Sequence, residues 1–281
     1  MTTINPFLNL ACPLDGAPLV RQDSAWRCDA GHSFDIARQG YTNLLPVQNK
    51  RSLDPGDSKL MVAARSRFLN AGWYQPVAEA ISSAVVAGHA GAAELSCLDA
   101  GCGEGYYLRQ LAASSALPLT LLGLDISKWA VLAAAKQDKR PNWVVGSNAN
   151  LPVLSGTLDC VLCVFGFPVY SEFARVLKPG GQLVQVDAGA DHLRELREIV
   201  YPTLKEKPAK ELLAPDGFEI LATETVRYPL TLTGAEPIAD LLAMTPHLYR
   251  ASAEGRAKAA ALTALTLTVD VRLTRLLRVR E

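Results

Sequence analysis

The chain has 281 residues, of which 49% are hydrophobic and 20% charged, and its formal net charge is zero. This composition suits one large or two modest globular domains and argues against a disordered chain. The charge balance excludes a strongly basic protein that coats nucleic acid and a protein with an acidic tail. It does not exclude nucleic acid as a substrate, because a local patch of basic side chains can bind phosphate even when the net charge of the protein is zero.

The six cysteines are too few to form a disulfide scaffold in a chain of this length. No window reaches about 18 consecutive apolar residues, and the first residues lack the basic region of a secretory signal. We therefore expect a cytoplasmic protein with no membrane span. Four cysteines lie in apolar surroundings, where packing is favoured over a redox or metal pair: Cys97, Cys102, Cys160 and Cys163.

In chain order, the patterns predict a small module over 1–50 and a helical connector over 51–90, with one helix over 61–69. Residues 91–200 alternate short apolar runs with helical patterns, which is typical of a parallel sheet. The remaining residues contain a helical segment around 235–244 and a strand-like run over 262–273. We therefore divide the chain into the module, the connector and a main domain over 91–281.

Basic residues gather toward the two ends of the chain. Residues 38–67 hold six basic side chains against two aspartates, and residues 250–281 are also basic on balance. Together they could form a rim that faces a phosphate backbone. Ordinary solvated surface explains the same charges.

The N-terminal module carries the ligand spacing of a zinc ribbon. Cys12 and Asp15 form one pair, and Cys28 and His32 form a second pair after a gap of twelve residues. Asp15 stands where a second cysteine is usual, and a carboxylate is a harder ligand than a thiolate. We expect these four residues to bind Zn²⁺, because so small a module needs a metal or a cross-link to stay folded. The carboxylate should make this binding weaker than that of a standard set. The alternative is a module without metal, held by packed aromatic side chains: Trp26, Phe34 and Tyr41.

A glycine-rich turn is the strongest chemical signal. A strand ending at 97–100 leads into Asp99-Ala-Gly-Cys-Gly-Glu-Gly105, whose glycines allow a tight turn and close approach of a ligand to the backbone. The next strand, 119–125, ends in Asp125, whose carboxylate can accept both hydroxyls of a ribose. Ser127 is expected to cap the helix over 127–135. The glycine spacing differs from G-x-G-x-x-G, so a dinucleotide-binding dehydrogenase is the weaker alternative.

This turn resembles the S-adenosylmethionine-binding loop of class I methyltransferases. Residues 158–165 match the fourth strand of that fold, and residues 173–187 match its next helix, turn and fifth strand. The resemblance implies an α/β, Rossmann-like fold with a mostly parallel seven-stranded sheet. It places these residues at the cofactor: Asp99, Gly101, Gly103, Glu104, Gly105, Tyr106, Asp125, Ile126, Asn148 and Ala149.

Several strings occur in an order that is similar to the bacterial 23S rRNA guanine-N1 methyltransferases. After the Cys12…Cys28…His32 set come Gly40-Tyr-Thr-Asn-Leu-Leu-Pro-Val47, Asp54-Pro-Gly-Asp-Ser58, the glycine turn and Met244-Thr-Pro-His247. The resemblance implies a zinc-ribbon head on a methyltransferase body, a guanine in a 23S rRNA hairpin as substrate, and a homodimer. It also places Tyr74 and His192 at the cofactor, although a packing role suits either residue equally well.

Methylation at guanine N1 requires removal of the N1 proton, so a carboxylate or histidine is expected near the base. Asp54, Asp57 and His192 are the candidates, and a turn around Pro55-Gly56 is the other explanation for the two aspartates. A paired base must also be extruded from its stem before reaction. We expect the segment over 50–67 and the zinc-ribbon head to hold the backbone of the hairpin.

The segment after the fourth strand lacks the Asn-Pro-Pro-Tyr motif of enzymes that methylate exocyclic amines. It offers instead Phe165, Phe167 and Tyr170, which could stack on a base. Two other functions stay open on the sequence alone. One is a small-molecule N-methyltransferase acting on a purine-like heterocycle, and the other is an S-adenosylmethionine-binding interaction module without turnover.

Overall fold

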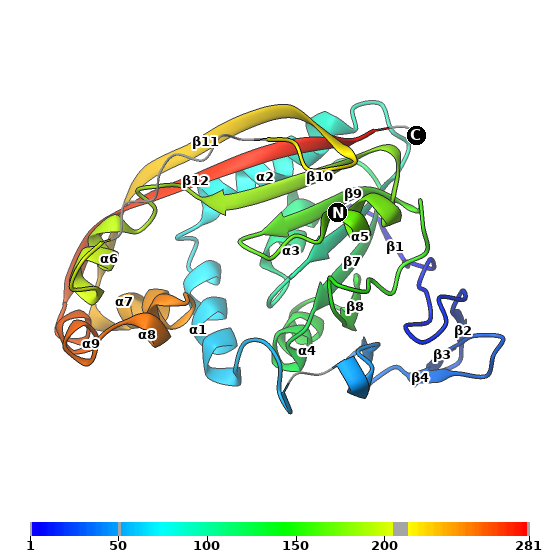
Figure 1. The fold of residues 1–281 in the computed structure, drawn as a ribbon, viewed down its shortest axis with the longest axis horizontal. Coiled ribbons are helices and arrows are strands. Elements are labelled where there is room, and N and C mark those ends of the chain that lie inside the picture. Colours follow the sequence, from blue (N-terminus) through cyan, green and yellow to red (C-terminus); the bar gives the residue numbers. More distant parts are fainter. Residues whose placement is uncertain (1, 50–51, 205–212, 280–281) are drawn as a thin grey trace.

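The computed structural model describes residues 2–49, 52–204 and 213–279, and a mixed β-sheet lies at its centre (Figure 1). The strand order is β11-β12-β10-β9-β6-β7-β8-β5, and β1 pairs with β7 beside that path. β12 is antiparallel to both of its neighbours, whereas the strands from β10 to β5 are parallel. The strands are β1 Ile4–Asn5, β5 Tyr41–Asn43, β6 Leu95–Ala100, β7 Leu119–Asp125, β8 Asn142–Val145, β9 Leu158–Val164, β10 Leu177–Ala188, β11 Phe218–Thr233 and β12 Ala264–Arg278.

Apolar side chains are buried on both faces of this sheet, as expected where parallel strands are covered on two sides. One face packs against all the longer helices except α5, and the other packs against α5 and the N-terminal residues. The helices are α1 Lys59–Asn70, α2 Gln75–Gly88, α3 Tyr106–Ser114, α4 Lys128–Gln137, α5 Tyr170–Val176, α6 Arg194–Val200, α7 Ala235–Ala243, α8 His247–Arg250 and α9 Ala253–Ala260, with a 3₁₀ turn at Val47–Asn49.

Local sequence signals explain where the elements next to the glycine turn begin and how they pack. Ser127 precedes α4 and its hydroxyl accepts a hydrogen bond from the N–H of Ala130 at 3.3 Å, as predicted for a cap. Gly123 lies in β7 because a Cβ there would lie 2.2 Å from the ring of Trp143. The bulky buried indole therefore requires glycine at this point of the neighbouring strand.

The N-terminal module is continuous with the main sheet rather than separate from it. Its own three-stranded antiparallel sheet comprises β2 Val20–Gln22, β3 Ala25–Arg27 and β4 Ser33–Asp35. However, β1 and β5 on either side of it pair with β7 and β8. The division at residue 50 thus does not coincide with a break between sheets. Figure 1 shows β2–β4 at the opposite end of the molecule from helices α6–α9.

The described sheet has nine strands: the seven expected from the resemblance and two more contributed by the N-terminal residues. The predicted strands over 119–125, 158–165 and 262–273 appear as β7, β9 and β12, and the predicted helix near 235–244 appears as α7. β11 was not predicted. Its 16 residues form an edge strand, mostly exposed along its length, so it lacks the apolar run that identifies a buried strand.

Candidate cofactor site and metal centre

The turn between β6 and α3 brings three glycines to the carboxyl end of the central strands. Their φ angles are +104° at Gly101, +55° at Gly103 and +80° at Gly105, a region that favours glycine. A Cβ on Gly101 would meet no atom within 4 Å, whereas a Cβ on Gly105 would lie 2.5 Å from the ring of Trp143. Gly101 therefore leaves open space beside the backbone for a ligand, and Gly105 lets the turn pack against the sheet.

Asp125, at the end of β7, is held in place by two backbone amides. Its Oδ2 accepts from the N–H of Gly103 at 2.9 Å, and its Oδ1 accepts from the N–H of Ser127 at 2.8 Å. Burial raises the pKa of Asp125, while these two bonds and the Arg65 guanidinium act in the opposite direction. A carboxylate offers about four acceptor positions, so capacity remains for the two hydroxyls of a ribose.

Three buried side chains beside this turn carry oxygens that have no hydrogen-bond partner among the described residues. They are both carboxylate oxygens of Asp99, Oε1 of Glu104 and Oδ1 of Asn148. Burial, followed by the negative charges of Asp125 and Glu104, raises the pKa of Asp99 to about 8. Buried acceptors without donors are rare. S-adenosylmethionine offers an ammonium group, an adenine amino group and ribose hydroxyls, so its donors and positive charge fit this set of acceptors.

The other predicted cofactor residues flank these acceptors. Glu104 accepts hydrogen bonds through Oε2 from Arg109 at 2.9 Å and from Gln137 at 2.6 Å. Tyr106 is buried, and its hydroxyl donates to Gln75 on α2. Ile126 and Ala149 are both exposed at the edge of the site. Ile126 directly follows β7, and Ala149 lies in the turn after β8.

The Asp54–Ser58 loop packs against the start of α4, immediately after the end of β7. Gly56 has a φ of +83°, and a Cβ there would lie 2.8 Å from Cγ2 of Ile126. The hydroxyl of Ser127 donates to the carbonyl of Asp57 at 2.7 Å. This loop therefore forms a wall beside the Asp125 carboxylate, whether or not either aspartate takes part in chemistry.

The two loop aspartates differ in their surroundings. The carboxylate of Asp57 forms an ion pair with Arg65 of α1, and Nη2 of Arg65 also donates to the carbonyl of Met244 at 3.2 Å. A Cβ on Gly103 would lie 3.6 Å from the Arg65 side chain. Asp54 is exposed and forms no ion pair with another described residue. Arg65 thus joins the loop, the glycine turn and the Met244–His247 string.

The sequence pattern assigns Arg65 to the basic segment expected to hold the RNA backbone, and gives it no role at the glycine turn. A signal for a different role was present. Arg65 lies three residues after Val62 and three before Phe68, so it falls on the apolar face of its helix. A charged residue on such a face needs a partner inside the protein.

Tyr74 and His192 lie together in a buried aromatic cluster. The hydroxyl of Tyr74 and Nε2 of His192 are 3.3 Å apart, and Nδ1 of His192 accepts the N–H of Asp270 at 3.2 Å. The ring of Phe165 stacks on the imidazole with centroids 5.6 Å apart. Burial lowers the pKa of His192 to about 4, so the ring is neutral at neutral pH. Because both ring nitrogens are engaged, this geometry suits a positioning role better than acceptance of a proton.

The three aromatic residues expected to stack on a base do not form one group. Phe165 has a left-handed φ of +53° and is 40% exposed, and Phe167 is 89% exposed. Both lie in the loop after β9. Tyr170 begins α5 instead, where its hydroxyl donates to Gln185 at 3.0 Å and its ring packs edge-on against Phe218.

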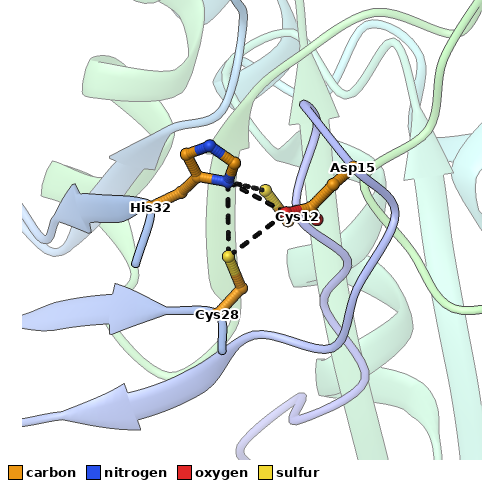
Figure 2. Close-up of side chains that lie close together, drawn as sticks. All are labelled: Cys12, Asp15, Cys28 and His32. Carbon is orange, nitrogen blue, oxygen red and sulfur yellow. Dashed lines mark hydrogen bonds and ion pairs between the residues drawn. The ribbon is translucent and has the colours of Figure 1, made fainter. Parts of the chain in front are cut away.

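The four predicted metal ligands converge at one point, as Figure 2 shows. Nδ1 of His32 lies 2.9 Å from Oδ2 of Asp15 and 3.4 Å from the sulfur atoms of both Cys12 and Cys28. All four ligand atoms lie within 4.8 Å of one another. Zinc bonds of about 2.0–2.3 Å in a tetrahedron place ligand atoms about 3.3–3.8 Å apart. The four donor atoms are thus gathered closely enough to surround one ion, and sulfur, nitrogen and oxygen are all donors that Zn²⁺ accepts.

Two tight turns present these ligands. The N–H of Gly16 donates to the carbonyl of Cys12 at 2.8 Å, and the N–H of Gly31 donates to the carbonyl of Cys28 at 3.0 Å. Both glycines have positive φ, of +76° and +87°. Trp26 and Phe34 pack beside the turns, whereas Tyr41 lies in β5 and contributes to the core on the other face of the main sheet.

Comparison with known proteins identifies relatives over most of the chain. Residues 10–53 match the family described as RlmA, N-terminal, and residues 98–185 match a methyltransferase domain family. A 23S rRNA (guanine(748)-N(1))-methyltransferase of Streptomyces fradiae is 37% identical over 84% of each chain. A protein of Micromonospora griseorubida, provisionally named a 23S rRNA (guanine-N(1)-)-methyltransferase, is 37% identical over 95% of this chain and 96% of its own. The chain belongs to the 23S rRNA (guanine-N1)-methyltransferase family.

Membership of this family confirms several expectations from the sequence. The protein is an S-adenosylmethionine-dependent methyltransferase of class I fold with an N-terminal zinc-ribbon domain, and both relatives are named for action on 23S rRNA. A Bacillus subtilis relative, also provisionally named for this activity, is 31% identical over 94% of the chain. No helix within the described residues is long and apolar enough to cross a membrane.

Proposed function

We propose that the protein transfers the methyl group of S-adenosylmethionine to N1 of a guanine in a hairpin of 23S rRNA. The observation that carries this proposal is the similarity to the Streptomyces and Micromonospora proteins over most of the chain. The matched family segments, 10–53 and 98–185, contain the metal set and the glycine turn of this chain. The buried acceptors beside that turn support it independently, because they match the donors of the methyl-carrying cofactor.

Each part of the cofactor has a proposed partner. Asp125 would hold the ribose, Asn148 the amino group of adenine, and Asp99 the ammonium group of the methionine part. Tyr74 and His192 would close the site from the far side of the glycine turn. When bound, the cofactor supplies a methyl group already activated by sulfonium, so the chain has to align the base, exclude water and remove the N1 proton.

Among the proposed bases, Asp57 is the more testable because its carboxylate is tied to Arg65. Asp54 is exposed and lies three residues away in the same loop. If Asp57 removes the N1 proton, replacing it by asparagine should abolish methylation. Methylation at the wild-type rate would remove Asp57 from consideration and leave it the role of holding Arg65.

We propose that the zinc-ribbon head contacts the RNA backbone to a greater extent than the segment over 50–67 does. Within the segment over 50–67, Lys50 and Arg51 lie outside the described residues, and Arg65 and Arg67 are paired with carboxylates of the chain. Lys59 is exposed, and its ammonium lies 5.9 Å from the centroid of the Trp129 ring. The head instead presents three exposed arginines that form no ion pair with another described residue: Arg21, Arg27 and Arg38. Phosphate contacts of this kind would weaken steeply with salt. We also propose a homodimer, on the family resemblance, which light scattering tests.

The decisive experiment offers the full-length protein tritiated S-adenosylmethionine together with 23S rRNA that lacks the modification. A parallel reaction contains free guanosine and guanine instead. Label in the RNA, mapped to N1 of one guanine, supports the proposal. Label only in the small molecules would replace it with a small-molecule methyltransferase, and cofactor binding without label in either would leave an interaction module.

A further inference from the structure

One face of the central sheet changes from apolar to polar along its strands. In the middle of β10 and near the end of β12, Leu183 and Leu276 are buried against α5 and its neighbours. Side chains on one face of a strand recur every second residue. The next positions on the same face are Gln185, paired with Thr274, and then Asp187, paired with Arg272. The polar part of the face lies toward the carboxyl end of β10, where ligands bind in sheets of this type.

Two donors on this face have unmet hydrogen bonds. Thr274 is 2% exposed, yet its hydroxyl has no partner among the described residues, and the same is true of the buried Nε of Arg272. Leaving a buried polar group unpaired costs about 1–3 kcal/mol. Such atoms beside an open strand end indicate a place that a polar ligand completes.

A chain of hydrogen bonds orients Asp187 on this face. The hydroxyl of Tyr170 donates to Oε1 of Gln185 at 3.0 Å, and Nε2 of Gln185 donates to Oδ2 of Asp187 at 2.8 Å. An ionised carboxylate only accepts, so the amide nitrogen of Gln185 faces Asp187 and its oxygen accepts from the Tyr170 hydroxyl. Oδ1 of Asp187 has no partner among the described residues, and no described cation forms an ion pair with this half-buried carboxylate.

The same strand places Asp187 at the level of the loop that follows β9, one strand away from the strand that leads into the cofactor turn. The N–H of Phe165 donates to the carbonyl of Val186 at 2.9 Å, so Asp187 follows at the level of the aromatic loop. Burial raises the pKa of Cys163 on β9 to about 12, and the carboxylates of Asp99 and Asp187 both add to this effect. One thiol therefore lies within electrostatic reach of the proposed ammonium-binding carboxylate and of Asp187.

The Watson–Crick edge of guanine carries two donors, N1–H and the N2 amino group, beside one acceptor, O6. A carboxylate next to an arginine matches that edge in both hydrogen bonding and geometry. We propose that Asp187 binds the N1–H and N2 edge of the target guanine, with Arg272 donating to O6, and that Oδ1 of Asp187 takes the N1 proton. This inference rests on the proposed function.

In the proposed step, the bond from N1 to the methyl carbon forms as the bond from that carbon to sulfur breaks. The electron pair of the broken bond goes to sulfur, leaving S-adenosylhomocysteine without a positive charge. The N1 proton passes to Asp187 and then to solvent. Asp187 has advantages over the earlier candidates, because Asp57 is neutralised by Arg65 and both nitrogens of His192 are engaged.

The test compares wild-type protein with Asp187→Asn in single-turnover methylation of unmodified 23S rRNA between pH 6 and 9.5. General-base catalysis contributes about 10²–10⁴-fold, so the variant should lose at least about 100-fold in rate at pH 7. The deficit should shrink as pH rises and N1 of guanine ionises without help. Affinity for S-adenosylhomocysteine, measured by calorimetry, should change less than about twofold. Asp159→Asn, at the opposite end of β9, is the matched control and should retain the wild-type rate.

Two further reagents separate recognition from folding. Tyr170→Phe removes only the hydrogen bond from Tyr170 to Gln185. It should therefore lower the rate of methylation modestly and leave the pH profile of that rate unchanged. RNA with inosine at the target lacks the N2 amino group and should react more slowly with wild type, with a smaller additional loss in Asp187→Asn.

Each outcome bears on one of the two proposals. Wild-type protein that labels no RNA would overturn the proposed function itself. If wild type labels RNA and Asp187→Asn keeps its rate within about threefold at pH 7, the role of Asp187 is refuted. A variant that loses cofactor affinity in step with its rate would also refute it, because Asp187 would then support the cofactor site rather than the base.

Discussion

Replacing Asp99 by asparagine is expected to stabilise the ligand-free protein at pH 8 and to weaken cofactor binding. Asp99 is fully buried, and neither of its oxygens has a hydrogen-bond partner among the described residues. Burial and the charges of Asp125 and Glu104 raise its pKa to about 8. Ionising this side chain in the absence of a positively charged ligand is therefore costly, and asparagine has the same shape without the charge.

The magnitude follows from proton linkage. Between about pH 4 and pH 8 the folded protein keeps a proton on Asp99 that the unfolded chain has released. The native state binds more protons across this window, so its stability falls as pH rises, by about 1.4 kcal/mol per pH unit at most. From pH 5.5 to pH 8 this group alone then removes up to about 3 kcal/mol, and the asparagine variant does not incur that loss.

Urea denaturation of both ligand-free proteins at pH 5.5 and pH 8 measures this difference. Asp159→Asn provides the control. Although burial acts to raise the pKa of Asp159, hydrogen bonds from Lys178 and Ser96 keep it below the usual range. Its removal should therefore cost the same stability at both pH values. If wild type and Asp99→Asn differ equally at the two pH values, the carboxyl of Asp99 is not protonated in the folded state and the reasoning fails.

The same substitution should weaken binding of S-adenosylmethionine. Hydrogen bonds to charged groups contribute about 1.5–3 kcal/mol, which corresponds to a loss in affinity on the order of 10- to 100-fold. Titration calorimetry measures it. A variant that is both more stable and a weaker binder would show that Asp99 is kept for the ligand rather than for the fold.

Three further predictions concern the surroundings of the site. Chelating the zinc should raise the dissociation constant for S-adenosylhomocysteine about fivefold, and Asn150→Ala should do the same with zinc bound. Calorimetry measures both constants. Unchanged constants in both cases would disprove a connection between the zinc-ribbon turn and the cofactor segment. Asp57→Asn frees Arg65 beside the glycine turn, so we expect weaker cofactor binding with an unaltered pH profile of methylation, and a shifted profile would argue for a base. Arg67→Met leaves the buried carboxylate of Asp240 unpaired and should cost about 1–2 kcal/mol in urea denaturation, more than Asp240→Asn, which leaves an arginine that water can reach.

The elements with a clear periodicity were predicted closely from the sequence. The strand over 119–125 matches β7, the cap at Ser127 is present, and the helix over 61–69 lies inside α1. These are cases where one buried face or one side-chain hydrogen bond leaves a local pattern. The convergence of the four candidate metal ligands was likewise predictable, because turns of fixed length constrain their spacing.

Contacts between distant segments were not predictable in the same way. β1 has only two residues, and its pairing with β7 depends on backbone groups that any sequence provides. The pairing of Arg65 with Asp57 requires the Asp54–Ser58 loop to fold back along α1, which composition does not indicate. Tyr170 was expected to face a base beside Phe165, but α5 begins at Tyr170 and turns its ring away. In each case tertiary geometry decided the outcome.

The attachment of the zinc-ribbon head shows why its role extends beyond RNA contact. The N–H of Ala11 donates to the carbonyl of Pro152 at 3.0 Å, and the amide of Asn150 donates to the carbonyl of Pro13 at 3.3 Å. Pro13 lies between the ligands Cys12 and Asp15, and Asn150 lies two residues after the adenine candidate Asn148. The turn that presents Cys12 and Asp15 therefore directly contacts the segment that follows Asn148. Since coupling between two sites is reciprocal, cofactor binding should in turn strengthen retention of the metal.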